Sequence, residues 1–195
     1  MENVIIIGSG PAGYTAGLYA SRAGLKPLMI AGQKIGGQLT DTNDVENFPG
    51  YREPVTGPEM MKDFRYQAEK FGTRIEEVYV DYVDLSEFPY VVKDHRGNKY
   101  ETKTVIISTG AETKWLGIES ETKFKGLGVS SCATCDGFFY KDQDVIVVGG
   151  GDTASEEALY LSNICRSVKV LVRSNIMKAS QIMQDRLFEN EKIEK

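Results

Sequence analysis

The sequence predicts an α/β protein with two doubly wound domains, and two observations lead to this fold class. Two glycine-rich turns, Gly8–Gly13 and Gly149–Ala154, each follow a short run of β-branched residues. Each turn also precedes a segment rich in alanine and leucine. Strand, glycine turn and helix in this order begin a βαβ unit, and a second copy of the unit indicates a second domain. We therefore expect two Rossmann-like nucleotide-binding domains.

The composition is that of an ordinary globular protein. The chain has 195 residues, of which 41% are hydrophobic, and a formal net charge of −5. Its Lys and Arg residues are scattered, which argues against a nucleic-acid-binding surface. The apolar run near the amino terminus is too short for a secretory signal, and the residues before it carry too little positive charge. No apolar run reaches membrane-spanning length. We expect a cytoplasmic protein that binds neither nucleic acid nor a membrane.

The first domain is predicted to begin with a complete βαβ unit. Residues 4–7 form the first strand, residues 11–23 the helix and residues 26–30 the second strand. The phosphates of a dinucleotide would lie on the amides at the start of this helix, where its dipole is positive. An acidic residue that binds the adenosine ribose usually follows the second strand, but residues 29–32 contain none. This absence weakens an assignment of NAD to the first turn.

The rest of the first domain contains a helix and an antiparallel insertion. Residues 57–71 are predicted to form a helix, because Gly57 and Pro58 suit its start and apolar residues follow at helical spacing. Residues 75–107 alternate and turn, which predicts an antiparallel insertion that ends in a buried strand at 105–108. The glycine-rich segment 36–50 either wraps a ligand or connects two elements. A change in composition places the domains at residues 1–114 and 115–195.

The second domain is predicted to repeat the βαβ unit. Residues 144–148 form its first strand, residues 153–161 its helix and residues 167–172 its next strand. Gly8 and Gly149 then occupy equivalent positions.

Two cysteines three residues apart, Cys132 and Cys135, are the candidate reactive groups. They can close into a disulfide, and a serine just before them can cap a helical turn that favours a thiolate. Asp136 beside them can manage a proton, or it is a surface turn residue. Cys165 is expected in the core and His95 in an exposed turn. We expect no metal site, because the cysteines and His95 lack the paired spacing of zinc ligands.

The chain resembles the low-molecular-weight, bacterial-type thioredoxin reductases, flavoproteins of the pyridine-nucleotide disulfide oxidoreductase family. The block around the two cysteines is the most specific part of this resemblance. The likeness runs through the whole chain and covers roughly the amino-terminal three-fifths of such a protein. It is carried by the segments Gly8–Gly13, Gly36–Leu39, Glu46–Gly50, Thr109–Ala111, Cys132–Phe139 and Gly149–Ala158.

The resemblance implies FAD in the first domain, NADPH in the second, and electron transfer through the dithiol to thioredoxin. It implies that Cys135 faces the flavin, that Cys132 attacks the disulfide of thioredoxin, and that Asp136 is the acid and base. It also implies a homodimer in the full-length form. The implied FAD-binding residues are Gly8, Gly10, Pro11, Ala12, Gly13, Gly37, Gln38, Leu39, Asn47, Thr109, Gly110 and Ala111. The implied NADPH-binding residues are Gly149, Gly151, Asp152, Thr153, Ala154, Arg173 and Lys178.

Two departures from the family pattern leave alternatives open. NADPH-dependent members usually carry His-Arg-Arg-x-x-x-Arg after the second strand, whereas residues 172–178 keep one arginine, with Ser174 and Lys178 at the other two positions. Lysine does not replace the bidentate fork of an arginine, so NADH or another electron donor is an alternative. Arg173 and Lys178 are alternatively solvated surface charges.

The second departure is at the carboxyl end, where the flavin-contacting Gly-Asp segment of the family has no counterpart. We expect a fragment or a natural short form with both domains incomplete. Such a chain would retain FAD weakly and dissolve poorly, because it would expose sheet edges and apolar faces. A flavin-dependent disulfide reductase with another donor, or a non-catalytic fragment, are the alternative functions.

Overall fold

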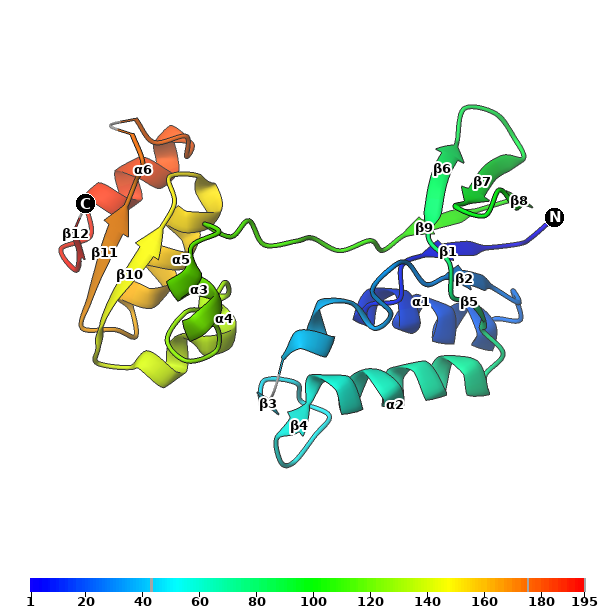
Figure 1. The fold of residues 1–195 in the computed structure, drawn as a ribbon, viewed down its shortest axis with the longest axis horizontal. Coiled ribbons are helices and arrows are strands. Elements are labelled where there is room, and N and C mark those ends of the chain that lie inside the picture. Colours follow the sequence, from blue (N-terminus) through cyan, green and yellow to red (C-terminus); the bar gives the residue numbers. More distant parts are fainter. Residues whose placement is uncertain (43, 175, 195) are drawn as a thin grey trace. The chain divides into compact units, whose positions relative to one another are not determined.

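The computed structural model describes residues 1–42, 44–174 and 176–194, and it confirms the predicted α/β fold class with parallel sheets. The chain divides into two compact units, Met1–Glu112 and Thr113–Lys195 (Figure 1). Unit 1 contains β1 (Ile5–Ile7), α1 (Pro11–Arg22), β2 (Leu28–Ile30), η1 (Gly37–Asp41), β3 (Asp44–Val45), β4 (Val55–Thr56), α2 (Gly57–Lys70), β5 (Arg74–Glu76), β6 (Val80–Asp84), β7 (Tyr90–Asp94), β8 (Lys99–Thr102) and β9 (Val105–Ile107).

Unit 1 is built on a four-stranded parallel sheet with the order β5-β2-β1-β9. The chain adds β2 and β5 on one side of β1 and then returns to place β9 on the other side. The order therefore reverses between β1 and β9. In open α/β sheets, ligands bind at the carboxyl ends of the strands at such a reversal.

The first strand consists of three isoleucines because both faces of the sheet are covered. Ile6 packs with Tyr14 and Met61 from the two helices, and Ile5 and Ile7 pack with Val92 of the antiparallel sheet. Figure 1 shows α1 and α2 on one side of the sheet and β6, β7 and β8 on the other. A strand buried on both faces is apolar throughout rather than alternating, as observed here.

The predicted antiparallel insertion is confirmed, with a correction at its start. β6, β7 and β8 pair antiparallel, whereas Arg74–Glu76 pairs parallel with β2 and belongs to the main sheet. This short strand was missed because its burial alternates and two of its three side chains are charged. The turn after β7 is organised by the buried carboxylate of Asp94, which accepts hydrogen bonds from Arg96, Asn98 and Tyr100.

Segment 36–50, for which wrapping a ligand and plain connection were left open, contains regular structure. Gly37–Asp41 is a 3₁₀ helix, and β3 pairs antiparallel with β4. The helix predicted after it is confirmed as α2, whose cap is Thr56: its Oγ1 accepts the amide of Glu59 at 3.3 Å. This serine- or threonine-type cap satisfies an amide at the helix start.

Unit 2 contains a parallel sheet in the order β10-β11-β12. Helix α5 packs on this sheet and α6 packs against α5 (Figure 1). Ala158, Val168 and Val170 lie in the core between them. On the opposite face the strands expose apolar side chains, with Ile146 61% exposed and Val148 52% exposed. The elements are α3 (Glu119–Phe124), α4 (Ala133–Asp136), η2 (Gly137–Tyr140), β10 (Asp144–Val148), α5 (Asp152–Ser162), β11 (Ser167–Leu171), α6 (Gln181–Phe188) and β12 (Ile193–Glu194).

Two single residues lie where the sequence predicts them. Cys165 is 1% exposed, and burial raises the pKa of its thiol, so it stays protonated and unreactive. His95 is exposed in the turn after β7 and stacks on the ring of Tyr79 with the ring centroids 4.0 Å apart. Among the described residues, the helices are all too short or too polar to cross a membrane.

The start of the second sheet predicts a measurable pH dependence of stability. Asp144 is bound by Arg166 and by Ser167, which lower the pKa of its carboxyl from 3.8 to about 2. A carboxyl with a lowered pKa stabilises the fold above its ordinary pKa, and the contribution is lost as the pH falls through about 2. Asp144→Asn should therefore lower the urea midpoint at about pH 5, and the deficit should shrink towards zero near pH 2.

The control is Glu191→Gln, which removes an exposed carboxyl that makes no hydrogen bond within the described residues. Its urea midpoint should follow that of the parent at each pH. A deficit in Asp144→Asn that is the same at both pH values would contradict the prediction.

Candidate nucleotide and dithiol sites

The first glycine turn is held by two close approaches and leaves one open position. Gly8 has a φ of +106°, and a Cβ on it would lie 2.3 Å from the carbonyl oxygen of Ser108. A Cβ on Gly13 would lie 2.0 Å from the carbonyl oxygen of Gly8. A Cβ on Gly10 would meet no atom within 4 Å. The outer glycines thus join helix and sheet, and the middle one leaves space for a ligand to approach the backbone.

The start of α1 presents unpaired amides to this open space. Gly10 is the N-cap and offers no side chain, and Pro11 takes the first turn of the helix, where a missing N–H costs nothing. The N–H groups of Ala12 and Gly13 therefore have no side-chain cap. Such amides, together with the helix dipole, bind phosphate groups.

Ser9 connects the turn to its neighbours and was missed by the sequence analysis. Its hydroxyl donates to the carbonyl of Ala31 at 2.7 Å and accepts the amide of Gly36 at 3.1 Å. A Cβ on Gly37 would lie 3.1 Å from the Cα of Gly10, so this loop lies directly beside the turn. The sequence offered one signal for this role, since Ser9 places a hydroxyl group between the first two glycines of the turn.

Of the other residues predicted for the first site, Thr109 lies beside the turn. A Cβ on Gly8 would lie 3.3 Å from the Cα of Thr109, and the exposed Gly110 and Ala111 follow it. Leu39 packs with the helices in the core, next to Gln38 in η1. Asn47 is exposed.

The second glycine turn repeats the geometry of the first. Gly149 has a φ of +148°, and a Cβ on it would lie 2.9 Å from the Cβ of Ala154. A Cβ on Gly151 would meet no atom within 4 Å, and Gly151 is the N-cap of α5 without a side-chain cap. Ala154 thus takes the place of the third glycine. Thr153 is exposed in the first turn of α5.

The loop after β11 is docked on the second turn. The carbonyl of Gly150 accepts the amides of Lys178 at 2.6 Å and Ala179 at 2.9 Å. Asp152 accepts the amide and the hydroxyl of Ser180, each at 2.8 Å, and these bonds lower the pKa of Asp152. Asp152, predicted to bind a cofactor, therefore has its carboxylate engaged with this loop.

The two cations of this loop are exposed. Neither Arg173 nor Lys178 forms an ion pair among the described residues, while the buried Met177 anchors the loop between them. Asn175, which falls within the predicted pattern, lies outside the described residues. The loop thus brings Lys178 beside the second turn and leaves both cations available.

Cys132 and Cys135 form a disulfide, with their Cα atoms 5.3 Å apart. Cys132 is the N-cap of α4, and its Sγ accepts the amide of Cys135 at 3.2 Å. The predicted serine cap is therefore wrong: the Oγ of Ser130 accepts the amide of Cys132 itself, at 3.1 Å. The carboxylate of Glu157, on α5, accepts the amide of Ala133. Sequence reasoning missed Glu157 because the contact joins residues that are distant in the chain.

The dithiol turn is accessible at the surface of unit 2. Cys135 is exposed, and Cys132 and Asp136 are half-buried. The carboxylate of Asp136 makes no hydrogen bond or ion pair within the described residues, so it is available to exchange a proton. Phe138 and Phe139, which follow, are 73% and 59% exposed.

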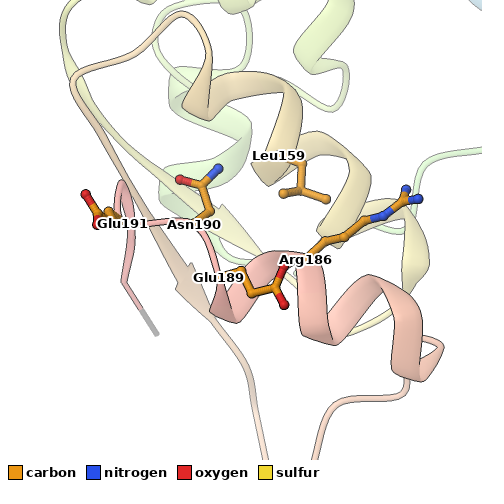
Figure 2. Close-up of a pocket in the computed structure, with 5 residues that line it drawn as sticks. All are labelled: Leu159, Arg186, Glu189, Asn190 and Glu191. Atoms are coloured by element: carbon orange, nitrogen blue, oxygen red, sulfur yellow. The ribbon is translucent and has the colours of Figure 1, made fainter.

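A hollow in unit 2 does not coincide with these groups. It is lined by residues of α5 and of the end of α6 and the segment after it, Leu159, Arg186, Glu189, Asn190 and Glu191 (Figure 2). None of the predicted site residues lines it. The candidate sites are therefore defined by the glycine turns and the dithiol rather than by the depth of the surface.

The fold and these sites define an α/β protein with two glycine turns of the dinucleotide-binding type and a disulfide-bonded pair of cysteines. The chain belongs to the pyridine nucleotide-disulphide oxidoreductase family, whose model matches residues 2–194. The resemblance found in the sequence is thereby confirmed. A thioredoxin reductase of Rickettsia conorii is 55% identical over 190 residues, which are 97% of this chain and 61% of that protein.

Solved structures give the same result. A thioredoxin reductase from Streptococcus pyogenes MGAS5005 is 43% identical with a TM-score of 0.85, over 100% of this chain and 63% of that chain. One from Giardia duodenalis is 37% identical with a TM-score of 0.91, over 98% of this chain and 62% of that chain. The chain thus spans about 61% of the length of the curated relatives it matches.

The glycine geometry predicts that two similar substitutions destabilise the fold to different extents. Gly13→Ala places a Cβ against a backbone carbonyl and should lower the free energy of unfolding by about 1–3 kcal/mol or more. Gly10→Ala meets open space at a φ of −71° and should cost less than about 1 kcal/mol, the usual price of alanine at an N-cap. Urea unfolding followed by circular dichroism measures both. Equal losses in the two variants would contradict this reading of the turn.

Proposed function

We propose that this chain carries the nucleotide-binding and dithiol parts of a thioredoxin-disulfide reductase. Electrons pass from NADPH through FAD and the Cys132–Cys135 disulfide to thioredoxin. The observation that carries the proposal is that disulfide, which lies next to Asp136 in a turn bonded to the helix that begins at the second glycine turn. The names of the relatives support it. Because the chain spans about 61% of those relatives, the activity of the whole protein is a proposal.

FAD is proposed for the first glycine turn, because the residues there fit a dinucleotide. The open position at Gly10 and the uncapped amides of Ala12 and Gly13 would hold the pyrophosphate. Gly37 and Thr109 would line it from the two neighbouring loops. FAD supplies two-electron transfer between a nicotinamide and a disulfide.

NADPH is proposed for the second turn. The equivalent open position at Gly151 and the uncapped start of α5, with Thr153, would hold its pyrophosphate. Arg173 and Lys178 would attract the 2′-phosphate as separate charges. Asp152 would act through its bonds to Ser180, which fix the loop that carries Lys178.

The dithiol reduces thioredoxin by two exchange steps that balance in electrons. The thiolate of Cys132 attacks one sulfur of the thioredoxin disulfide, forms a mixed disulfide and releases the other sulfur as a thiolate, which Asp136 protonates. The thiolate of Cys135 then attacks Cys132, re-forms the Cys132–Cys135 disulfide and releases the second thioredoxin thiol. Two electrons are transferred to thioredoxin.

The roles of the two cysteines follow the family resemblance rather than their exposure. Within unit 2, Cys135 is more exposed than Cys132, so either sulfur is open to attack. The homodimer and the cytoplasmic location likewise stay predictions.

A second candidate is a related flavin-dependent disulfide reductase with another electron donor. Ser174 and Lys178, in place of two arginines of the usual pattern, favour it. Reduction of the flavin by reduced ferredoxin or another carrier, but not by NADPH, would distinguish this candidate.

Binding of FAD should depend on the open position of the first turn. Gly10→Ala fills the space of the pyrophosphate and should weaken FAD binding by at least about tenfold, since one lost close contact of this kind is worth about 1.4 kcal/mol or more. Quenching of flavin fluorescence measures the affinity. Gly151→Ala, at the equivalent open position of the second turn and at a φ of −100°, is the control for a glycine outside the first turn. Equal FAD affinity in Gly10→Ala and the parent would exclude this turn as the FAD site.

Exchange with thioredoxin should trap a complex at Cys132. Cys135→Ser removes the second thiol, so a single-cysteine thioredoxin activated with thionitrobenzoate should form a stable one-to-one mixed disulfide with it. Cys132→Ser should form this complex at least about tenfold more slowly than Cys135→Ser. Non-reducing mass spectrometry identifies the complex, and the double variant gives the baseline, because the buried Cys165 does not compete.

Faster trapping by Cys132→Ser would reverse the assigned roles of the cysteines. If neither single variant forms the complex faster than the double variant does, the proposed function is overturned.

A further inference from the structure

We propose that Glu157 is a positioning residue for the dithiol: it holds the turn between the two cysteines in the reduced state and disfavours their thiolate form. The inference deepens the proposed function and rests on it in one respect, that the Cys132–Cys135 disulfide is reduced and re-formed. Glu157 has no role in the sequence analysis and is not among the predicted site residues.

Glu157 reaches the dithiol turn from a different element. Its Oε2 accepts the amide of Ala133, the first residue of the four-residue helix α4, directly between the two cysteines. Ala133 is 7% exposed, so its N–H has little access to water. A buried N–H without a partner destabilises the fold, and this acceptor removes that cost.

The position of Glu157 is itself fixed by packing. Its neighbour on α5, Ala158, is fully buried in the core of unit 2. One turn further along α5, Leu161 and Tyr160 contact the backbone at Gly137, where a Cβ would lie 2.9 Å from the Leu161 side chain. The carboxylate therefore projects from a rigid helix, and that helix begins at the second glycine turn.

The hydrogen bond gains importance when the disulfide opens. Reduction adds two electrons and two protons, breaks the S–S bond and removes the covalent tie between Cys132 and Cys135. The ties of the turn that do not involve a cysteine sulfur include the bond from Ala133 to Glu157, the bond from the amide of Asp136 to the carbonyl of Cys132 at 3.1 Å, and the contact at Gly137. Among these, the bond from Ala133 is the one made to a charged side chain.

The charge of Glu157 also acts on the sulfurs. A carboxylate close to a thiol disfavours the thiolate, whereas the amide of Cys135 that points to the Cys132 sulfur favours it. Besides the cysteines, α4 carries Asp136, and the elements packed against it carry Tyr140 on η2 and, among the titratable groups of α5, Glu157 and Tyr160. Of the two carboxylates, Glu157 is the one hydrogen-bonded to the turn, so its removal changes charge and position together.

Two variants separate the charge from the hydrogen bond. Glu157→Gln keeps an oxygen that accepts the amide of Ala133 but removes the charge, and Glu157→Ala removes both. Glu156→Gln is the matched control, because Glu156 is the exposed neighbour and makes no hydrogen bond among the described residues.

The first measurement is the alkylation rate of the dithiol against pH. The full chain is reduced with dithiothreitol, which supplies the electrons and protons, and alkylation by iodoacetamide is followed by mass spectrometry. Below about pH 7, Glu157→Gln should react about three- to tenfold faster than the parent, as expected for a larger thiolate fraction. Glu156→Gln should match the parent. A role in folding alone would not move this profile.

The second measurement is hydrogen exchange of the amides in α4. In the reduced chain, Glu157→Ala should exchange them at least about tenfold faster than the parent, with a smaller change in the oxidised chain, and Glu157→Gln should stay close to the parent. An unchanged alkylation profile in Glu157→Gln overturns the proposal, and so does unchanged exchange in reduced Glu157→Ala. Should Glu157→Ala fail to fold, the profile of Glu157→Gln still decides.

These measurements use no flavin, nicotinamide or thioredoxin. Failure of the thioredoxin trap therefore leaves the inference about Glu157 standing, and failure here leaves the proposed function standing.

Discussion

The close approach between the start of α1 and the carboxyl end of β1 is the constraint on which unit 1 depends. The carbonyl of Gly8 occupies the place of a side chain at Gly13, so helix and strand meet at backbone distance. That contact sets α1 on the sheet and aims its uncapped amides at the point where the strand order reverses between β1 and β9. The packing of the helix and the orientation of these amides therefore have a single cause, the absence of a Cβ atom at Gly8 and Gly13.

Unit 2 uses the same device for a second purpose. Gly149 and Ala154 bring α5 onto its sheet, and α5 then carries Glu157 to the dithiol turn. The candidate nucleotide site at the start of α5 and the dithiol turn, which contacts the middle of α5, are thus connected by one helix. A small-residue turn at its start fixes the position of a carboxylate five residues later, and so the environment of the cysteines.

Much of the fold was predictable because its signals are local. The strand, glycine turn and helix of both βαβ units, the helix α2 and the hairpin of β7 and β8 follow from runs of a few residues. β5 was not predictable, since three residues with two charges do not show the apolar run of a buried strand. The contacts that shape the sites were also out of reach. Ser9 with Gly36, Asp152 with Ser180 and Ala133 with Glu157 each join residues more than twenty positions apart, and nothing in either local sequence indicates its partner.

In the loop after β11, the residues that attach the loop to the second turn differ from the residues that would select a nucleotide. The loop is attached through the carbonyl of Gly150 and the carboxylate of Asp152, which bind backbone and Ser180, whereas Arg173 and Ser174 lie outside these attachments. Residues that would choose between nucleotides can therefore change while the attachment stays in place. Under the proposed function, substitutions at a few exposed positions would change the choice of electron donor and leave the attachment of the loop intact.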